Sequence, residues 1–428
     1  MRKLSLVLVV LLVVVMSFPE VVVRLGGWVS SPSETHALEE VVKTFNEEYA
    51  GKIKLVYEPI PGDYKVKLTA MLSAGTAPDI FYLDTSWAEE FFRKGVIQPL
   101  DLLIRKHGLD LSDFYPSLLD AFKYDGRIYG LPKDFSTLAL FYNKRMFDEV
   151  GLEYPNENWT WVDLVYAASK LTRDLDGDGQ IDVWGLSLYR DGAFNRVIPF
   201  IVQAEGKVVN DDLTTALDNP NSVEGIRFYL DLHRKYKVTA APQDVGAGWL
   251  GDAFGKEKAA MVMSGPWMLG FMRDNFPNVD FGVVELPKYK QRATMVYTVC
   301  YSIPKTSEHK DEAFIALKYL VTKGMEIFTE KLGVLPSRIS LAKGLISDPI
   351  KGPFMKGVEY AIPWRIPTPS GIFSKAENEI NTRISKVWMG EMSLEVAIEE
   401  IVANYDACLL YTSPSPRDLS TSRMPSSA

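Results

Sequence analysis

A carboxylate and an indole follow directly on a short apolar run, Ile80 to Leu83. The carboxylate belongs to Asp84 and the indole to Trp87. A carboxylate accepts hydrogen bonds from hydroxyl groups, and a flat indole covers the apolar face of a ring, so the pair suits a sugar. Ligands of open α/β sheets bind beyond the carboxyl ends of the strands, which is where these side chains would lie. The alternative is that Asp84 only caps the next helix and Trp87 packs on the surface.

A second apolar run, Ala259 to Ser264, also leads to an indole, that of Trp267. Gly265 and Pro266 precede it, and Pro266 stiffens the backbone, which favours a ring held flat against a ligand. Trp249 lies just before this run and is a further candidate. The structural alternative for Trp267 is a tryptophan of the hydrophobic core.

Carboxylates alternate with glycine in a third segment, which contains Asp174, Asp176, Asp178 and Asp182. Oxygen ligands at this spacing suit Ca²⁺, but the twelfth position is Gly185, where an EF-hand has a bidentate glutamate. The segment therefore predicts either a structural Ca²⁺ site or an ordinary turn rich in Asp and Gly. Both alternatives stay open.

Composition bounds the function. The chain has 428 residues, of which 47% are hydrophobic and 24% charged, so we expect a globular protein of two domains. The formal net charge of -8 and the lack of Lys/Arg clusters argue against nucleic acid as a partner.

The two ends of the chain differ in character from the rest. Residues 1–19 combine Arg2 and Lys3 with an apolar run from Leu4 to Met16, which predicts a secretory signal peptide. No cysteine lies near its end, so we expect no lipid attachment there. The last stretch, 408–428, is rich in Ser, Pro and Arg and has no periodicity, and we expect it to be a non-native tail.

Strand and helix patterns alternate after the signal peptide. Strands are predicted at Val21–Leu25, Ile53–Tyr57 and Ile80–Leu83, with helices between them. Ser86 and Glu89 have the spacing of a capping box and predict a helix that begins there. This order is typical of a parallel sheet covered by helices.

Four motifs in this order resemble the periplasmic sugar-binding proteins of ATP-driven importers, the extracellular solute-binding protein family. They are Gly75–Trp87, Leu140–Asn143, Ala260–Trp267 and Tyr301–Pro304. The resemblance implies an α/β fold of two lobes, each a β-sheet flanked by helices, with a ligand cleft between them and crossovers near residues 137, 301 and 340. The implied N-terminal lobe is 20–137 plus 302–342, and the C-terminal lobe is 138–301 plus 343–407.

The resemblance also implies ligand contacts. It matches Trp267 to a sugar-stacking tryptophan, places Asp84 and Trp87 in a polar sugar-contact loop, and includes Asp134, although Lys133 occupies an expected apolar position. With Trp249 from the strand-end pattern, the candidate ligand-binding residues are Ser31, Glu34, Asp84, Trp87, Asp134, Trp249, Trp267 and Trp364.

The expected function is capture of a neutral sugar or oligosaccharide and its delivery to the membrane permease subunits of an ABC importer. We expect a periplasmic or extracellular monomer that is not an enzyme and requires no cofactor beyond the calcium considered above. Two alternatives remain. One is a binding protein for peptides or amino acids, with Arg196 or Arg365 as a charged clamp, and the other is an extracellular glycoside hydrolase that uses two carboxyl groups.

Overall fold

The computed structural model describes residues 19–28, 32–212, 214–332, 334–363 and 373–412. Most of the predicted signal peptide, Ser31, Trp364, Arg365 and residues 413–428 therefore lie outside the described residues. The described strands form two large sheets and one short hairpin, β4 (Lys123–Tyr124) with β5 (Arg127–Ile128).

The first sheet has seven strands, in the order β13-β6-β12-β3-β1-β2, with β14 paired to β12. β1 runs parallel to β2 and β3, whereas β12 runs antiparallel to β3 and β6. The three strands predicted near the N-terminus are confirmed here. The bounds are β1 Val21–Gly27, β2 Ile53–Pro59, β3 Ile80–Asp84, β6 Leu131–Thr137, β12 Thr294–Ser302, β13 Leu335–Pro336 and β14 Ala361–Pro363.

The second sheet has five strands, in the order β11-β7-β10-β8-β9. β10 lies between an antiparallel partner, β7, and a parallel partner, β8. The bounds are β7 Ala139–Asn143, β8 Leu186–Ser187, β9 Thr239–Ala240, β10 Met261–Ser264 and β11 Phe281–Glu285.

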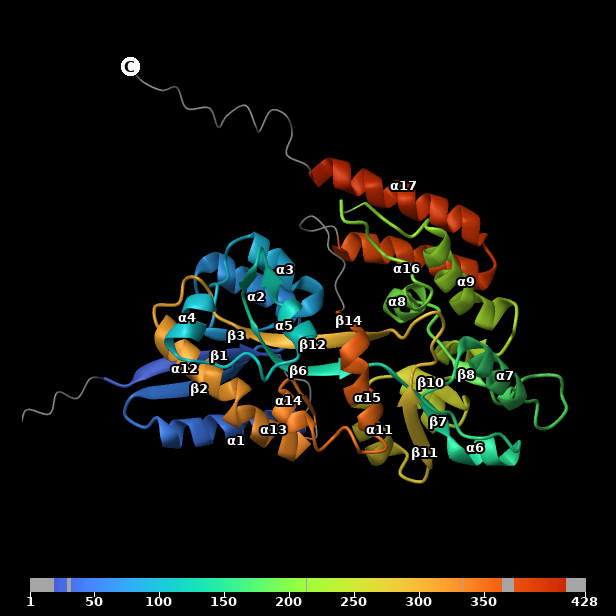
Figure 1. The fold of residues 1–428 in the computed structure, drawn as a ribbon, viewed down its shortest axis with the longest axis horizontal. Helices are drawn as coiled ribbons and strands as arrows, with labels where there is room; N and C mark the ends of the chain where they lie inside the picture. Colours follow the sequence, from blue (N-terminus) through green and yellow to red (C-terminus); the bar gives the residue numbers. More distant parts are fainter. Residues whose placement is uncertain (1–18, 29–31, 213, 333, 364–372, 413–428) are drawn as a thin grey trace, which may run out of the picture.

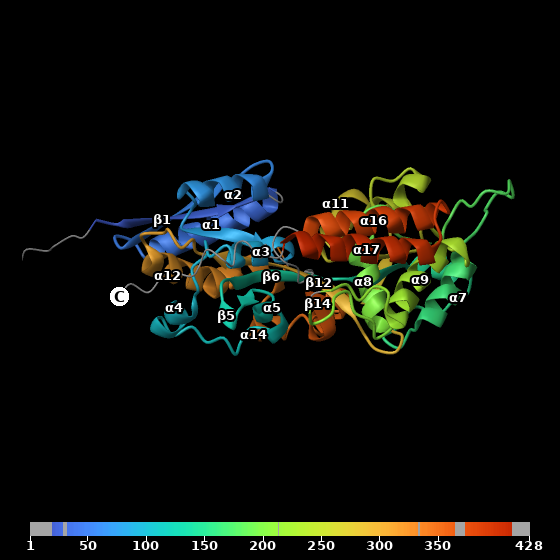
Figure 2. The ribbon, with the colours of Figure 1, turned by 90° about the horizontal axis from the view of Figure 1, so that it is seen from above.

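Helices surround each sheet, and the two groups occupy opposite ends of the long axis, with β6 and β12 between them (Figures 1 and 2). Around the first sheet lie α1 Pro32–Glu48, α2 Tyr64–Ala74, α3 Thr85–Arg93, α4 Asp101–Lys106, α5 Pro116–Asp120, α12 Lys310–Val321, α13 Lys323–Leu332 and α14 Ile339–Ala342. Toward the second lie α6 Lys144–Glu149, α7 Trp161–Leu171, α8 Phe194–Gln203, α9 Pro220–Arg234, η1 Pro242–Val245, α10 Leu250–Gly255, α11 Trp267–Asn275, α15 Gly352–Gly357, η2 Val358–Tyr360, α16 Phe373–Met389 and α17 Leu394–Thr412.

Local sequence explains several helix ends. Gly75 ends α2 in a left-handed conformation (φ 70°), and Thr160 caps α7 in a capping box with Asp163, as their types predict. The predicted cap at Ser86 is wrong by two residues. Asp84 caps α3 instead, because its carboxylate reaches the backbone N–H of Ser86.

Three large cores hold the elements together. One fills the first group of helices and strands and one the second, where faces of α16 and α17 join α7, α8 and α9. A third core joins the two sheets, because Phe135 and Val296 of the first sheet pack in one cluster with Phe141 of the second.

The chain passes from the first sheet to the second at Leu138, between β6 and β7, where the first crossover was expected. It returns between Glu285 and Thr294, before β12. The sequence-based division assigned residues up to 301, and so nearly all of β12, to the C-terminal lobe. In the structure β12 belongs to the first sheet, where its partners are β3, β6 and β14. The strand pattern alone does not reveal these partners. The last helix also differs, since α17 continues to Thr412, past the boundary expected at 407.

Close packing of α8 on α9 depends on Gly225. A Cβ at this position would lie 2.4 Å from Cα of Ile201, so an added methyl group must push the helix backbones apart. We expect Gly225→Ala to lower the free energy of unfolding by about 2 kcal/mol in a urea titration. Gly344→Ala is the control, because a Cβ there meets no atom within 4 Å. Equal stability of the two variants would contradict the packing described.

Candidate functional site

The carboxylate of Asp84 stands at the junction of β3 and α3. One of its oxygens accepts hydrogen bonds from the backbone N–H (2.9 Å) and the hydroxyl (2.5 Å) of Ser86. Burial raises the pKa of Asp84, and the two hydrogen bonds oppose this increase. Asp84 therefore caps α3 through one carboxylate oxygen, its second oxygen keeps acceptor capacity for a ligand, and the ligand contact stays a prediction.

A buried ammonium group links two further candidate residues. Lys133 is only 4% exposed, and its Nζ donates to Asp134 Oδ2 (2.5 Å) and to Glu34 Oε1 (3.0 Å). Its Nζ also lies 4.7 Å from the centre of the Phe328 ring. Burial acts to lower the pKa of Lys133, but the carboxylates of Asp134 and Glu34 outweigh it, so the pKa is raised and the ammonium stays charged. Lys133 thus neutralises the carboxylates of Glu34 and Asp134 and allows them to lie close to each other.

Aromatic rings cluster beside these carboxylates. Trp28 meets the rings of Tyr64 and Tyr82 edge-on, each with centroids 5.2 Å apart, and Trp87 lies 6.3 Å from Tyr64. The hydroxyl of Tyr64 donates to the backbone carbonyl of Tyr82 (3.0 Å). The sequence analysis did not select Trp28 or Tyr64 as site residues, although Trp28 follows a strand end in the same way as Trp87.

On the second lobe, Trp267 begins α11 and is 42% exposed, which rules out the core alternative. Its indole folds back over Gly265, where a Cβ would lie 2.1 Å from Cζ3 of the ring. Glycine is therefore required for this ring position. The indole meets Tyr297 edge-on at 5.7 Å, and the guanidinium of Arg196 lies 5.8 Å from the indole centre.

β12 brings the two groups together. Val299 pairs with both Asp84 and Asp134, and Tyr297, two residues earlier, lies on the same face of the strand. Burial raises the pKa of the Tyr297 phenol, the Arg196 guanidinium opposes the increase, and the Asp84 carboxylate adds to it. The register thus places the Trp267, Tyr297 and Arg196 group next to the carboxylates of the first lobe.

Trp249 has a different environment. Its ring folds over Gly251 and meets Phe271 edge-on at 4.7 Å. No ring contact joins it to Trp267 among the described residues. Its ligand contact stays a prediction without support from this geometry, and Ser31 and Trp364 lie outside the described residues.

The Asp-rich segment forms a compact turn. Carboxylate oxygens of Asp174, Asp176 and Asp182 lie within 4.8 Å of one another. Asp178 is not part of this group, and its carboxylate accepts from the backbone N–H of Gln180 (2.7 Å). Hydrogen bonds from the backbone N–H groups of Gly179 and Gly177 lower the pKa of Asp174. Three carboxylates could thus contribute to an oxygen-ligated cation, and calcium stays a prediction.

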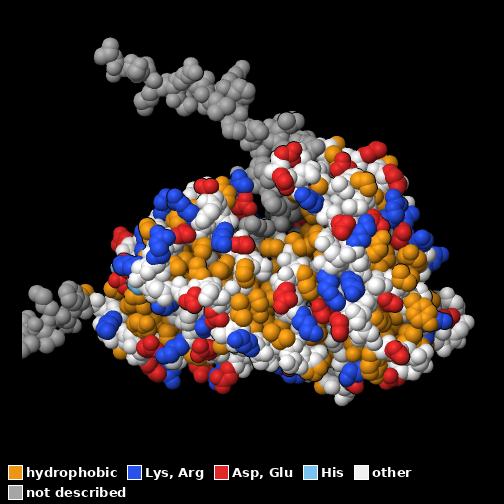
Figure 3. All heavy atoms as spheres, in the orientation of Figure 1, with side chains coloured by type: hydrophobic (Ala, Val, Ile, Leu, Met, Phe, Trp, Pro, Cys, Tyr) orange, Lys and Arg blue, Asp and Glu red, His pale blue; other side chains and the backbone are white. Residues whose placement is uncertain are grey.

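Surface charge agrees with the sequence analysis. Basic and acidic side chains are interspersed on the face that Figure 3 shows, without a broad patch of one sign. Among the described residues, no helix combines the length and apolar character needed to cross a bilayer.

Comparison with known proteins decides the family. The model of the bacterial extracellular solute-binding protein family matches residues 31–327. The chain is a bacterial extracellular solute-binding protein.

Relatives of this solute-binding protein include a Brucella abortus protein named only as a binding protein, 29% identical over 71% of this chain and 73% of the relative. The maltotriose-binding protein of Pyrococcus abyssi is 26% identical over 75% of this chain and 69% of its own length. An ABC substrate-binding protein of Listeria monocytogenes, solved with cycloalternan, has a TM-score of 0.77 and 27% identity, over 91% of this chain and 99% of that structure. The α/β fold of two lobes is thereby confirmed.

Removal of the buried ammonium should destabilise this solute-binding protein. Lys133→Met leaves Glu34 and Asp134 without their shared cation, and we expect a loss of about 3 kcal/mol in the free energy of unfolding, measured in urea. Lys106→Met is the control, because its pair with Asp311 is exposed and contributes less than about 1 kcal/mol. Wild-type stability of Lys133→Met would mean that water solvates the two carboxylates.

Calcium should stabilise the fold if the Asp-rich turn binds it. At a free concentration 100 times the Kd, binding to the folded form alone adds about 2.7 kcal/mol. EDTA should then lower the thermal midpoint and calcium restore it, whereas Asp174→Asn should show neither change. A midpoint that both treatments leave unaltered would support the ordinary turn.

Proposed function

We propose that this solute-binding protein captures a neutral oligosaccharide outside the cytoplasmic membrane and delivers it to the permease subunits of an ABC importer. The supporting observation is the register of β12, which sets Tyr297, beside Trp267, next to Asp84 and Asp134. A pyranose has apolar ring faces and a rim of hydroxyls, so this combination of indole and carboxylates complements it. The names of several relatives, for maltotriose, galactooligosaccharide and arabinooligosaccharide, support the same ligand class.

The proposal includes a monomer that works in the periplasm or at the cell surface and does not alter its ligand. Each candidate carboxylate already has a structural partner, since Asp84 caps α3 and Lys133 binds Glu34 and Asp134. Such groups suit hydrogen bonding to sugar hydroxyls. A hydrolase would need a carboxylic acid and a second carboxylate at set positions across one glycosidic bond.

A peptide or amino acid ligand is less well supported. Its carboxylate would need a guanidinium available for pairing, but Arg196 donates to the Tyr297 hydroxyl and lies over the rings of Tyr189, Trp267 and Tyr297. The guanidinium therefore already has one partner, the Tyr297 phenol, which its Nη1 contacts.

A titration of mono-, di- and oligosaccharides and of dipeptides, followed by intrinsic tryptophan fluorescence, tests the ligand class. We expect saturable changes with one or more saccharides, and recovery of that saccharide unaltered by chromatography. Saturation by dipeptides alone, or hydrolysed sugar, would refute the proposal.

Trp267 tests the site. We expect Trp267→Ala to weaken binding of the best saccharide about 30-fold by calorimetry, because loss of a stacked aromatic ring costs about 2 kcal/mol. The thermal midpoint should change little, since the ring is already 42% exposed. The control is Trp159→Ala, which removes an indole that packs on Phe147 in the second lobe. If Trp267→Ala melts much earlier and its folded fraction binds normally, the indole belongs to the fold and not to the site.

A further inference from the structure

A second aromatic cavity lies in the second lobe, between α7 and α9. Figure 1 shows these two helices at the end of the molecule that is far from α3. Its walls come from α7, α9 and the segment at Tyr289, and its volume is about 520 Å³. This volume falls in the range of small-molecule sites. None of the residues considered above for the first site lines it.

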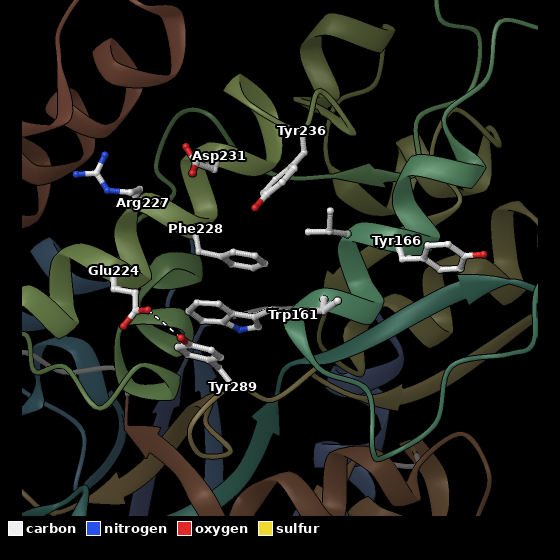
Figure 4. Close-up of a pocket in the computed structure, with 10 residues that line it drawn as sticks. Trp161, Tyr166, Glu224, Arg227, Phe228, Asp231, Tyr236 and Tyr289 are labelled. Atoms are coloured by element: carbon white, nitrogen blue, oxygen red, sulfur yellow. Dashed lines mark hydrogen bonds between the residues drawn. The ribbon is translucent and has the colours of Figure 1, made fainter.

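Three rings form a rigid stack along one wall, as Figure 4 shows. The Trp161 centroid lies 4.0 Å from that of Phe228 and 4.2 Å from that of Tyr289, with interplanar angles of 8° and 13°. The Trp161 indole donates to Gln203 Oε1 (2.6 Å), and the Tyr289 hydroxyl to Glu224 Oε1 (2.9 Å). The stack is therefore held in place before any ligand arrives.

Tyr236 faces the cavity on the side of Phe228 away from Trp161 (Figure 4). No ring contact joins Tyr236 to Phe228 among the described residues, although both line the cavity. Tyr236 is 37% exposed, and the neighbouring Val162 is 77% exposed. Both rings thus line the cavity without stacking on each other, and a ligand ring placed there would cover apolar surface that water now contacts. The ammonium of Lys235 lies 5.2 Å from the centre of the Tyr236 ring.

Polar groups at the rim favour a neutral ligand with hydroxyls. Glu224 pairs with Lys290 (2.7 Å) and Arg227 with Glu395 (2.9 Å), so both charges are already balanced. The carboxylate of Asp231 makes no side-chain hydrogen bond or ion pair with the residues that the structure describes, and it can accept from a hydroxyl. Arg234 follows Asp231 by three residues on α9 and donates to the backbone carbonyl of Val387, so its positive charge offsets that of Asp231 and makes an organic cation a poorer match.

We propose that this cavity is a second, weaker saccharide site, in which one pyranose ring lies between Phe228 and Tyr236 and donates a hydroxyl to Asp231. This second site rests on the proposed function in one respect only, namely that the ligand is a saccharide. It adds a contact for sugar outside the cleft, on a surface that does not depend on the relative position of the lobes.

Saturation-transfer NMR on the full chain tests this site, with methyl α-D-glucopyranoside and methyl β-D-galactopyranoside as probes. We expect binding of at least one glycoside in the millimolar range, unchanged in Trp267→Ala and weakened at least 5-fold in Tyr236→Ala and in Asp231→Ala. Tyr154→Ala is the matched control, since this tyrosine is 40% exposed and lies outside the cavity. Thermal midpoints verify that each variant folds.

Three results would overturn the second site. The first is the absence of any saturation-transfer signal from the glycosides. The second is a signal that is lost in Trp267→Ala but in no other variant. The third is a signal that neither Tyr236→Ala nor Asp231→Ala weakens. Binding of cyclohexylmethanol as tight as that of the glycosides, and insensitive to Asp231→Ala, would also overturn it in favour of a purely apolar contact. If the second site is overturned while an oligosaccharide still binds in a way that depends on Trp267, the proposed function is unaffected. A glycoside whose binding depends only on Tyr236 and Asp231 supports the second site, whereas the cleft is tested separately by the effect of Trp267→Ala on oligosaccharide binding.

Discussion

The antiparallel pairing of β12 with both β3 and β6 is the constraint on which the candidate site depends. Val299 lies opposite Asp84 on one side and Asp134 on the other, so hydrogen bonds of the sheet set the distance between these carboxylates. Tyr297 continues the same face toward Trp267. A shift of one residue in this register would turn Tyr297 to the other face of the sheet and separate the two halves of the site. The backbone thus positions the site, and the side chains supply its chemistry.

Lys133 shows how a charge can replace an expected apolar residue without loss of the fold. Burial of one ammonium alone would be costly, but two carboxylates and the rings of Tyr82 and Phe328 surround it. The ion pairs in turn hold Glu34, from the first turn of α1, against β6. The same two ion pairs therefore neutralise the charge of Lys133 and orient the carboxylates of Glu34 and Asp134.

Tryptophans that look alike in the sequence have three different roles. Trp267 is exposed beside Tyr297, Trp249 packs over Gly251 and Phe271, and Trp161 is the buried centre of a ring stack. Each begins or directly precedes a helix. Neighbouring glycines and the packing of adjacent helices decide which ring face meets solvent, and hence which indole can meet a ligand.

Local signals in the sequence determined the early strands, the caps at Gly75 and Thr160, and the strand-end positions of Asp84 and Trp267, because these depend on residues close in the chain. The division into two lobes was predicted from the family resemblance and not from local patterns. Tertiary structure alone decided that β12 joins the first sheet and that Lys133 binds Glu34, since each involves a partner that local patterns do not identify. It also decided that Arg196 lies among Tyr189, Trp267 and Tyr297. The contacts of Lys133 with Glu34 and of Arg196 with Tyr297 join residues 99 and 101 positions apart, and hydrophobic periodicity carries no information about pairs at such separations.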